Sequence, residues 1–196
     1  MSKIMGYTEL KALMEEKLPR KRFIHSLGVA ETAMTLAVRF GLDVDGALIA
    51  GMYHDAYRYI SKDEALSEVR RYGIFIYKEE EENENLLHAP IAAYHMRDDV
   101  GPVPLSYVKA VRFHTLGSPE MGRLGAAVYI ADYSEPGRKH LDEEERKRIY
   151  SHESLEEMVG YIIEKQNEYF RKEGIRNASI TDELYSFLAR GGRFED

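Results

Sequence analysis

Apolar residues recur at spacings of three or four along most of this chain, and this periodicity restricts it to helical folds. The clearest helix is predicted over residues 20–40, and Gly41 is placed to end it. Its apolar face is formed by Phe23, Leu27, Ala30, Met34 and Ala37. Strict strand alternation, internal repeats and low-complexity linkers are all missing from the sequence. We therefore predict an all-α helical bundle that forms a single domain over residues 1–196.

Capping residues, proline and glycine predict the bounds of the other helices. Ser61 and Glu64 form a capping-box pattern for a helix that Gly73 ends, and Ser106 is expected to cap another. The stretch 78–85 is acidic and expected to be exposed, with Glu79–Glu82 as a solvated face. Besides 20–40 and the helix after Ser61, helices are predicted over residues 7–18, 44–59, about 85–97, 106–117 and 122–134, followed by two or three C-terminal helices, the last from about Thr181. The core is expected over about 20–138, with helices over about 142–192 packing on it.

Composition excludes several classes of function. The sequence contains no cysteine, which excludes disulfides, thiolate catalysis and cysteine-ligated zinc. No apolar run approaches the roughly 18 residues of a membrane helix, and the first residues lack the apolar core of a signal peptide. We therefore expect a cytoplasmic protein with no membrane association. A net charge of −7 lacks the basic field of general nucleic-acid binding, so a polyanion would need a cleft with concentrated positive charge or metal.

An adjacent histidine and aspartate, His54-Asp55, stand in the apolar segment AGMYHDAYRY. An ionised aspartate is costly to bury in such a helix unless a charge or a metal compensates it. Imidazole nitrogen and carboxylate oxygen together suit zinc, iron or manganese. Neighbours on a helix point about 100° apart, so both can reach one ion beside it. An isolated pair of this kind is more often a surface or capping pair, so the hypothesis needs further ligands.

Four more residues extend the pair to a set. Asp132 follows an apolar run, where metal ligation and a hydrogen bond to the backbone or to Arg138 are equally good explanations. His25, His88 and His114 would each, taken singly, be structural histidines. Together with His54-Asp55 they place one candidate ligand group on each of five predicted helices. Metal sites in helical bundles are built in this way.

The order His, His-Asp, Asp is the signature of the HD-domain metal-dependent phosphohydrolase superfamily. The words RFIHSLGVAETA, AGMYHDAYR, LLHAPIAAY, AVRFHTLG and VYIADYSEPGR resemble the YqeK family of HD-domain symmetrical bis(5'-nucleosyl)-tetraphosphatases. The resemblance covers about Arg22 to Arg138 well and the C-terminus more loosely. The sequence departs from the family pattern at Ala89-Pro90, where a glycine usually follows the histidine, and at Arg58, where lysine is common.

The resemblance implies an HD-domain bundle that holds two divalent metal ions, expected to be iron, with manganese, cobalt and zinc as alternatives. It implies one ion bound by His25, His54, Asp55 and Asp132, and a second bound by Asp55, His88 and His114. Asp55 would be the bridging ligand and the catalytic residue, acting with an activated water. The implied substrate is diadenosine tetraphosphate (Ap4A), cleaved into two ADP molecules.

Residues outside the metal shell are candidates for phosphate contact. They are Arg58, Thr115 and Arg138, for which a surface ion pair, a turn hydroxyl and a helix-end contact are the alternatives. Arg22 matches a basic family position and is a further group that would attract a polyanion. Three histidines fit no ligand order and are interpreted as exposed or packing residues: His95, His140 and His152.

Two other functions remain open. One keeps the site and changes the substrate to a deoxynucleotide or a cyclic nucleotide. The other is a nucleotide-binding regulatory module whose metal cluster is structural. The complete ligand set and the small residues around the pair argue against the module: Ala47, Ala50, Gly51 and Ala56. The expected partners are a dinucleoside polyphosphate or ADP, not nucleic acid, and a homodimer is compatible with the sequence.

Overall fold

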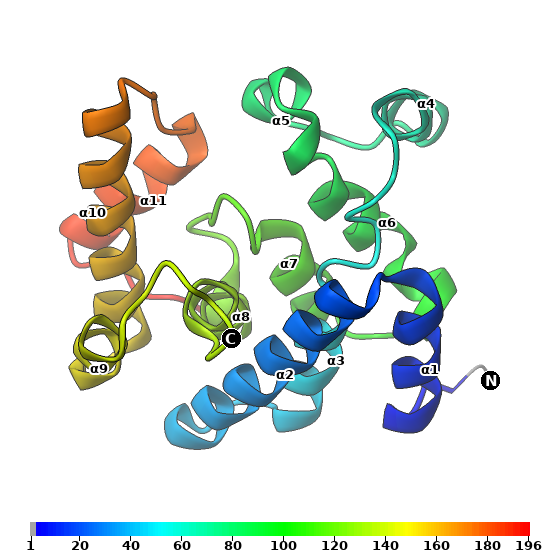
Figure 1. Cartoon of the computed structure of the whole chain (residues 1–196), viewed down its shortest axis with the longest axis horizontal. Helices are drawn as coiled ribbons and strands as arrows, with labels where there is room; N and C mark the ends of the chain where they lie inside the picture. The colour runs from blue at the N-terminus through cyan, green and yellow to red at the C-terminus, as the bar shows by residue number, and fades with distance from the viewer. Residues whose placement is uncertain (1–2) are drawn as a thin grey trace.

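The computed structural model describes residues 3–196, which form α-helices, one short 3-10 turn and connecting loops, without a strand (Figure 1). The first elements are α1 (Tyr7–Lys17), α2 (Arg20–Phe40), α3 (Val44–Tyr53), α4 (Lys62–Tyr72), α5 (Lys78–Glu82) and the 3-10 turn η1 (Glu84–Leu86). They are followed by α6 (His88–Val100), α7 (Leu105–Phe113), α8 (Gly122–Ser134), α9 (Glu143–Ser151), α10 (Leu155–Glu173) and α11 (Ser179–Ala189). The all-α prediction is confirmed.

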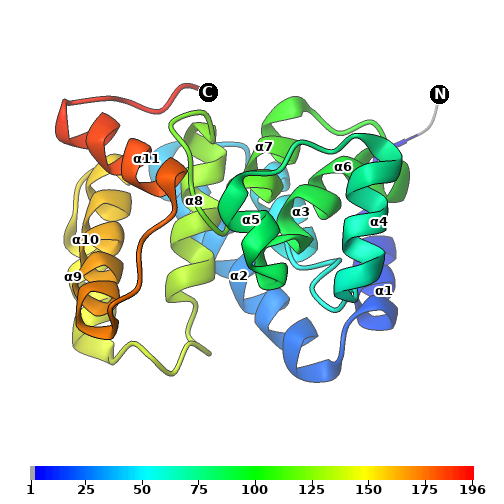
Figure 2. The ribbon, with the colours of Figure 1, turned by 90° about the horizontal axis from the view of Figure 1, so that it is seen from above.

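Helices α2, α3, α7 and α8 pack against one another at the centre of the molecule (Figures 1 and 2). Small side chains allow the close approach of α2 and α3. An added Cβ on Gly51 of α3 would lie 2.8 Å from the Cα of Ala30 in α2, so this position has no room for a side chain. The close packing keeps the beginning of α2 beside the end of α3, and these two segments carry His25 and His54.

Two groups of helices flank this centre. Seen from above, α1, α4 and α6 lie on one side, and α9, α10 and α11 lie on the other (Figure 2). Helix α10 packs on α8, and both α9 and α11 pack on α10. Ser61 and Glu64 form the predicted capping box of α4, while Gly41 and Gly73 end α2 and α4 as predicted.

Three details of the sequence prediction outside the candidate site are wrong. Helix α7 begins at Leu105 after Pro104, so Ser106 is its second residue rather than its cap. The helix predicted from about residue 85 begins at His88, because η1 precedes it. The acidic stretch is not simply a solvated face, because Glu80 is fully buried and pairs with Arg112 of α7 at 2.6 Å.

Among the described residues, the structure contains no helix with the length and apolar character needed to span a membrane.

Candidate metal centre

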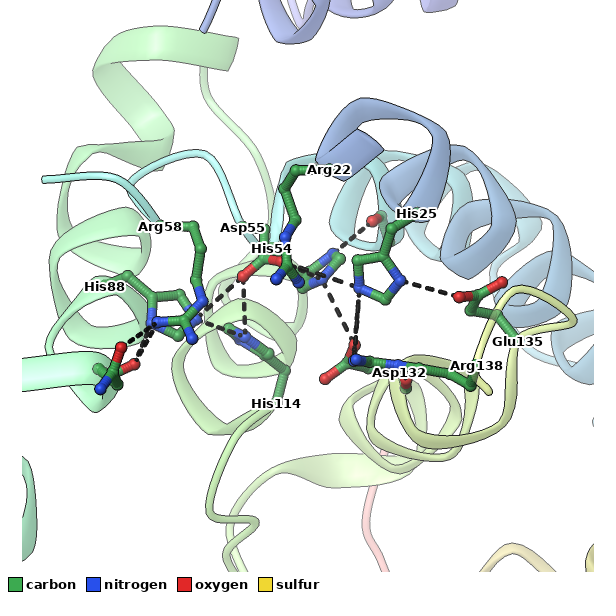
Figure 3. A network of polar contacts seen from close by, with 12 residues as sticks. Arg22, His25, His54, Asp55, Arg58, His88, His114, Asp132, Glu135 and Arg138 are labelled. Atoms are coloured by element: carbon green, nitrogen blue, oxygen red, sulfur yellow. Dashed lines mark hydrogen bonds and ion pairs between the residues drawn. The ribbon is translucent and has the colours of Figure 1, made fainter. Parts of the chain in front are cut away.

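The six predicted metal ligands meet in one cluster at the centre of the bundle (Figure 3). Three overlapping trios each have ligand atoms within 4.8 Å of one another: His25, His54 and Asp55; His54, His114 and Asp132; and Asp55, His88 and His114. The first and third trios fall within the two ligand groups that the family resemblance implied. The second trio links the two groups through His114 and Asp132. These residues come from five different helices or helix ends, so the tertiary fold assembles the cluster.

The His54-Asp55 pair lies at the end of α3 rather than inside it. The helix was predicted to continue to Tyr59, but it ends at Tyr53 and His54 is its C-cap. Beyond that point the chain makes tighter i to i+3 hydrogen bonds, from Ala56 N to the Tyr53 carbonyl and from Arg58 N to the Asp55 carbonyl, both 2.9 Å. The turn places both side chains at the cluster.

Three of the four imidazoles are oriented by their own backbone. In each, Nδ1 donates to the carbonyl oxygen three residues earlier, which leaves Nε2 free to face the cluster. The acceptors are Gly51 for His54 (2.7 Å), Asn85 for His88 (2.8 Å) and Val111 for His114 (2.7 Å). His54 and His114 are the C-caps of α3 and α7, where the last carbonyls of a helix lack helical partners, and His88 is the first residue of α6.

The fourth imidazole, His25, is oriented by a carboxylate. Its Nδ1 lies 3.0 Å from Oε1 of Glu135, and its Nε2 lies 3.0 Å from Oδ1 of Asp132. Glu135 belongs to the quoted word VYIADYSEPGR, but sequence reasoning gave it no role. An acidic residue before Pro136-Gly137 is ordinary in a turn, and nothing in the local pattern indicates a partner 110 residues away.

Asp55 presents one oxygen to each side of the cluster. Its Oδ2 lies 3.3 Å from Nε2 of His54 and 3.8 Å from Nε2 of His25. Its Oδ1 lies 3.1 Å from Nε2 of His88 and 4.0 Å from Nε2 of His114. Ligand atoms bound at about 2.1 Å to one ion lie about 3 Å apart when adjacent, so the distances from Asp55 to His54 (3.3 Å) and to His88 (3.1 Å) are near those of a metal shell.

Two features of the imidazoles indicate that a cation fits here. Nε2 of His54 is buried and makes no hydrogen bond within residues 3–196. Nε2 of His88 and Nε2 of His114 lie 3.1 Å apart. Because both Nδ1 atoms donate to carbonyls, the two rings in their neutral forms would turn lone pairs toward each other, an arrangement that a metal ion relieves.

The two carboxylates of the cluster are held in their ionised form. Burial by itself would raise the pKa of Asp55, but the adjacent imidazoles of His54 and His88, which are positively charged when protonated, outweigh it and hold that pKa well below its usual range. Burial would likewise raise the pKa of Asp132, but the hydrogen bond that Nε2 of His25 donates when that ring is protonated, together with the charge of His54, lowers it. Ionised carboxylates are the form that binds metal.

The pKa values of the two fully buried imidazoles, His54 and His114, are shifted in opposite directions. Burial lowers the pKa of His114 to about 3, and the positive charges of His54 and His88 act in the same direction, so this ring is neutral over the physiological range. Burial also opposes the charged form of His54, but the negative charge of Asp55 outweighs it and raises the pKa of that imidazole. A metal ion at His54 therefore competes with a proton.

Arginines border the accessible edge of the cluster. Arg22 donates to Oδ2 of Asp55 at 2.8 Å, and Arg138 hydrogen-bonds both the carboxylate and the carbonyl of Asp132. The side chains of Arg22 and Arg138 are 25% and 28% exposed and that of Asp132 is 19% exposed, whereas His54 is fully buried. A ligand from solvent therefore reaches the cluster on the side of Asp132.

The other two predicted phosphate-binding residues, Arg58 and Thr115, do not contact the carboxylates at this edge. Arg58 donates at 2.8 Å to the Asn85 carbonyl, the same oxygen that accepts from His88, so it supports that imidazole. The hydroxyl oxygen of Thr115 is buried and has no hydrogen-bond partner within residues 3–196. Their contact with phosphate stays a prediction.

The remaining histidines lie outside the cluster, as the sequence predicted. His95 is hydrogen-bonded to Glu68 at 2.7 Å and stacked on Tyr57. His140 packs against Tyr133 and His152 against Tyr161.

Comparison with known proteins identifies relatives that belong to the HD domain family. Residues 22–137, which contain all six cluster residues, match the HD domain family. A relative from Halalkalibacterium halodurans, named symmetrical bis(5'-nucleosyl)-tetraphosphatase, is 37% identical over 131 residues, 65% of this chain and 67% of its own. A relative of the same name from Staphylococcus aureus is 33% identical over 171 residues, 85% of each chain. A solved structure from Clostridium acetobutylicum, described as a predicted HD superfamily hydrolase involved in NAD metabolism, is 26% identical and superposes with a TM-score of 0.87, covering 96% of this chain and 100% of that one.

Proposed function

The chain belongs to the HD domain family, and on this premise we propose that it is a metal-dependent phosphohydrolase that cleaves Ap4A symmetrically into two ADP molecules. The names of the relatives support the substrate and the position of cleavage. The observation that carries the proposal is the position of Asp55, whose two oxygens face two separate groups of imidazoles. A carboxylate in this position can bridge a pair of cations.

The cluster divides into two proposed metal positions. Together with the bridging Asp55, His25, His54 and Asp132 would hold the first ion, and His88 and His114 would hold the second. The buried Nε2 of His54 and the facing Nε2 atoms of His88 and His114 support this division. The trio of His54, His114 and Asp132 is compatible with this division. Two adjacent metal positions bring ligands of the first close to ligands of the second.

The donor set supports a transition metal. Four imidazole nitrogens and two carboxylates are typical ligands of iron, manganese, cobalt and zinc, and we propose iron as the metal. Two divalent cations against two carboxylates leave a surplus of about two positive charges at the centre. That surplus suits a polyphosphate, and in a chain of net charge −7 it favours a small polyanion over nucleic acid.

When bound, the two cations lower the pKa of water so that it can act as a nucleophile near neutral pH, and they neutralise charge on phosphoryl oxygens. The residues of the chain supply position and further charge, which is most of what phosphoryl transfer requires. Arg22 and Arg138 lie at the accessible edge and would donate to phosphate oxygens, since guanidinium groups match them in a forked geometry. Arg58 would act at the His88 end, and the Thr115 hydroxyl would donate one further hydrogen bond.

Product analysis tests this function directly. The purified protein, loaded with iron, cobalt or manganese, is incubated with Ap4A and the products are separated by ion exchange. Two ADP molecules per substrate are expected. AMP plus ATP would reject symmetrical cleavage, and turnover of a deoxynucleoside triphosphate or a cyclic nucleotide in place of Ap4A would assign another substrate. Metal binding without any hydrolysis would support the regulatory module.

A further inference from the structure

One imidazole of the metal centre depends on a distant side chain. His54, His88 and His114 take their orientation from carbonyls three residues earlier in the chain. His25 lies in the first turns of α2, and Oε1 of Glu135, 3.0 Å from its Nδ1, comes from the turn after α8. A carboxylate that accepts from Nδ1 of an imidazole fixes the orientation of the ring and keeps the proton on Nδ1. The lone pair of Nε2 is then available to a metal ion, and Nε2 becomes a more basic metal ligand.

Glu135 is held firmly in place. Its residue is 4% exposed, its backbone N–H continues the hydrogen bonds of α8 to the Ala131 carbonyl, and Gly137 N donates to its Oε2. The side chain of Arg146 in α9 fastens the same turn. It donates to the carbonyls of Ser134 (2.8 Å), Arg138 (3.2 Å) and Glu135 (3.4 Å).

Two glycines leave the space that this carboxylate occupies. An added Cβ on Gly28, one turn after His25 in α2, would lie 2.7 Å from Oε2 of Glu135. An added Cβ on Gly137 would lie 2.9 Å from the same oxygen. Gly28 lies within α2 and has no positive φ, so its backbone does not require glycine, and the close carboxylate is the contact that a side chain there would meet.

We propose that Glu135 is the positioning residue of the first metal position. It holds Nε2 of His25 toward Asp132 and adds a negative charge behind that ligand, while the second position, at His88 and His114, does not depend on it. The proposal rests on the metal centre of the proposed function. Because Arg138 follows Glu135 in the same turn and contacts Asp132, one short segment would set both a metal ligand and a phosphate contact.

Metal titration of three variants tests the proposal without using hydrolysis. Metal-free full-length protein is titrated with Co²⁺ by calorimetry and visible absorption. Glu135→Ala removes the acceptor, Glu135→Gln keeps an acceptor without the charge, and Gly28→Ala displaces an intact carboxylate. Glu68→Gln is the matched control, because Glu68 makes a 2.7 Å contact with His95 outside the centre.

Loss at one position only is the expected result. The wild type and Glu68→Gln should bind two Co²⁺ per chain. One of the two Co²⁺ affinities should fall about 100-fold in Glu135→Ala and about tenfold in Glu135→Gln and Gly28→Ala. The other affinity should stay within about twofold of wild type. Excess Co²⁺ should restore full occupancy of the weakened position.

Two outcomes overturn the inference and one overturns its premise. Two unchanged affinities in Glu135→Ala, or equal loss at both positions in Glu135→Gln, would reject the positioning role while leaving the proposed function intact. If Glu135→Ala fails to fold, Glu135→Gln and Gly28→Ala decide by the same criteria. A wild-type protein that binds no Co²⁺ would reject the metal centre itself.

Discussion

The two ends of the metal centre are built from different kinds of contact. At the end formed by His88 and His114, each ring is buried and oriented by a backbone carbonyl of the adjoining turn. At the other end, His25 and Asp132 are partly exposed and depend on side chains of the turn that contains Glu135. The His88–His114 end is therefore fixed by local backbone geometry, whereas His25 and Asp132 at the other end are held by charged groups from elsewhere in the chain and are the more exposed ligands.

Asp55 joins the two ends, so its loss should have the largest effect. Asp55→Asn keeps the volume and removes the charge that faces both groups of imidazoles. We expect Ap4A hydrolysis to fall about 10³-fold or more and both Co²⁺ affinities to weaken, because both metal positions lose a ligand. Steady-state kinetics and calorimetry measure these changes, with exposed Asp98→Asn as the control. Retention of one full-affinity ion would separate the two ends and reject the bridge.

Arg138 tests whether the accessible end receives the phosphates. Arg138→Ala removes a guanidinium that is 28% exposed and contacts Asp132. We expect kcat/KM for Ap4A to fall about 100-fold, since hydrogen bonds to developing phosphoryl charge are lost. Arg148→Ala, which removes an exposed arginine paired with Glu144, is the control and should change kcat/KM less than about twofold. Equal rates for both variants would place the substrate elsewhere.

The pH dependence of metal binding should also be asymmetric. The pKa of His54 is raised by Asp55, so its proton competes with a metal ion as the pH falls, whereas His114, with a pKa of about 3, is already neutral. The Co²⁺ affinity at the His54 end should therefore increase with pH, by up to about tenfold per pH unit, over the range in which His54 is protonated in the metal-free protein. Metal binding in that range should release one proton from His54. Because His114 adds no competing proton, the affinity at its end of the centre should change less between pH 6 and 8. Co²⁺ titrations in buffers of different ionisation enthalpy measure both quantities, and equal slopes would contradict this assignment.

The smallest effect is expected at the locally built end. Asn85→Ala leaves the carbonyl that orients His88 in place, because that acceptor belongs to the backbone. Both Co²⁺ affinities should stay within about twofold of wild type, in contrast to the loss expected for Glu135→Ala at the other end. A tenfold weakening in Asn85→Ala would mean that the local end also depends on side chains.

Residue type and helical periodicity indicate the six candidate ligands, whereas their division into two groups and the bridging role of Asp55 were implied by the family resemblance alone. Helical periodicity places each ligand on its own helix, and His and Asp are distinctive residue types in apolar surroundings. The end of α3 at Tyr53 was missed, because no glycine or proline stands there and residues 54–59 have no other helix breaker. The tighter turn is selected by the tertiary contacts of His54 and Asp55, which periodicity does not contain.

Long-range charge pairs decide the surroundings of two glutamates that the local sequence does not predict. Glu80 stands in a run of four glutamates that is typical of a solvated face, yet Arg112 from α7 pairs with it inside the protein. Glu135 stands in an ordinary turn sequence and acquires its role from His25 in another helix. In both cases a partner distant in the sequence decides the burial of a glutamate, and the local pattern has no signal for that partner.

The proposed metal centre is a pair of ions that share Asp55. Anomalous diffraction from crystals of the Co²⁺-loaded protein, with metal content measured on the same preparation, tests it most directly. We expect two anomalous peaks per chain, both within bonding distance of the Asp55 carboxylate, one beside His25 and Asp132 and the other beside His88 and His114. A single peak, or two peaks of which one does not contact Asp55, would contradict the claim.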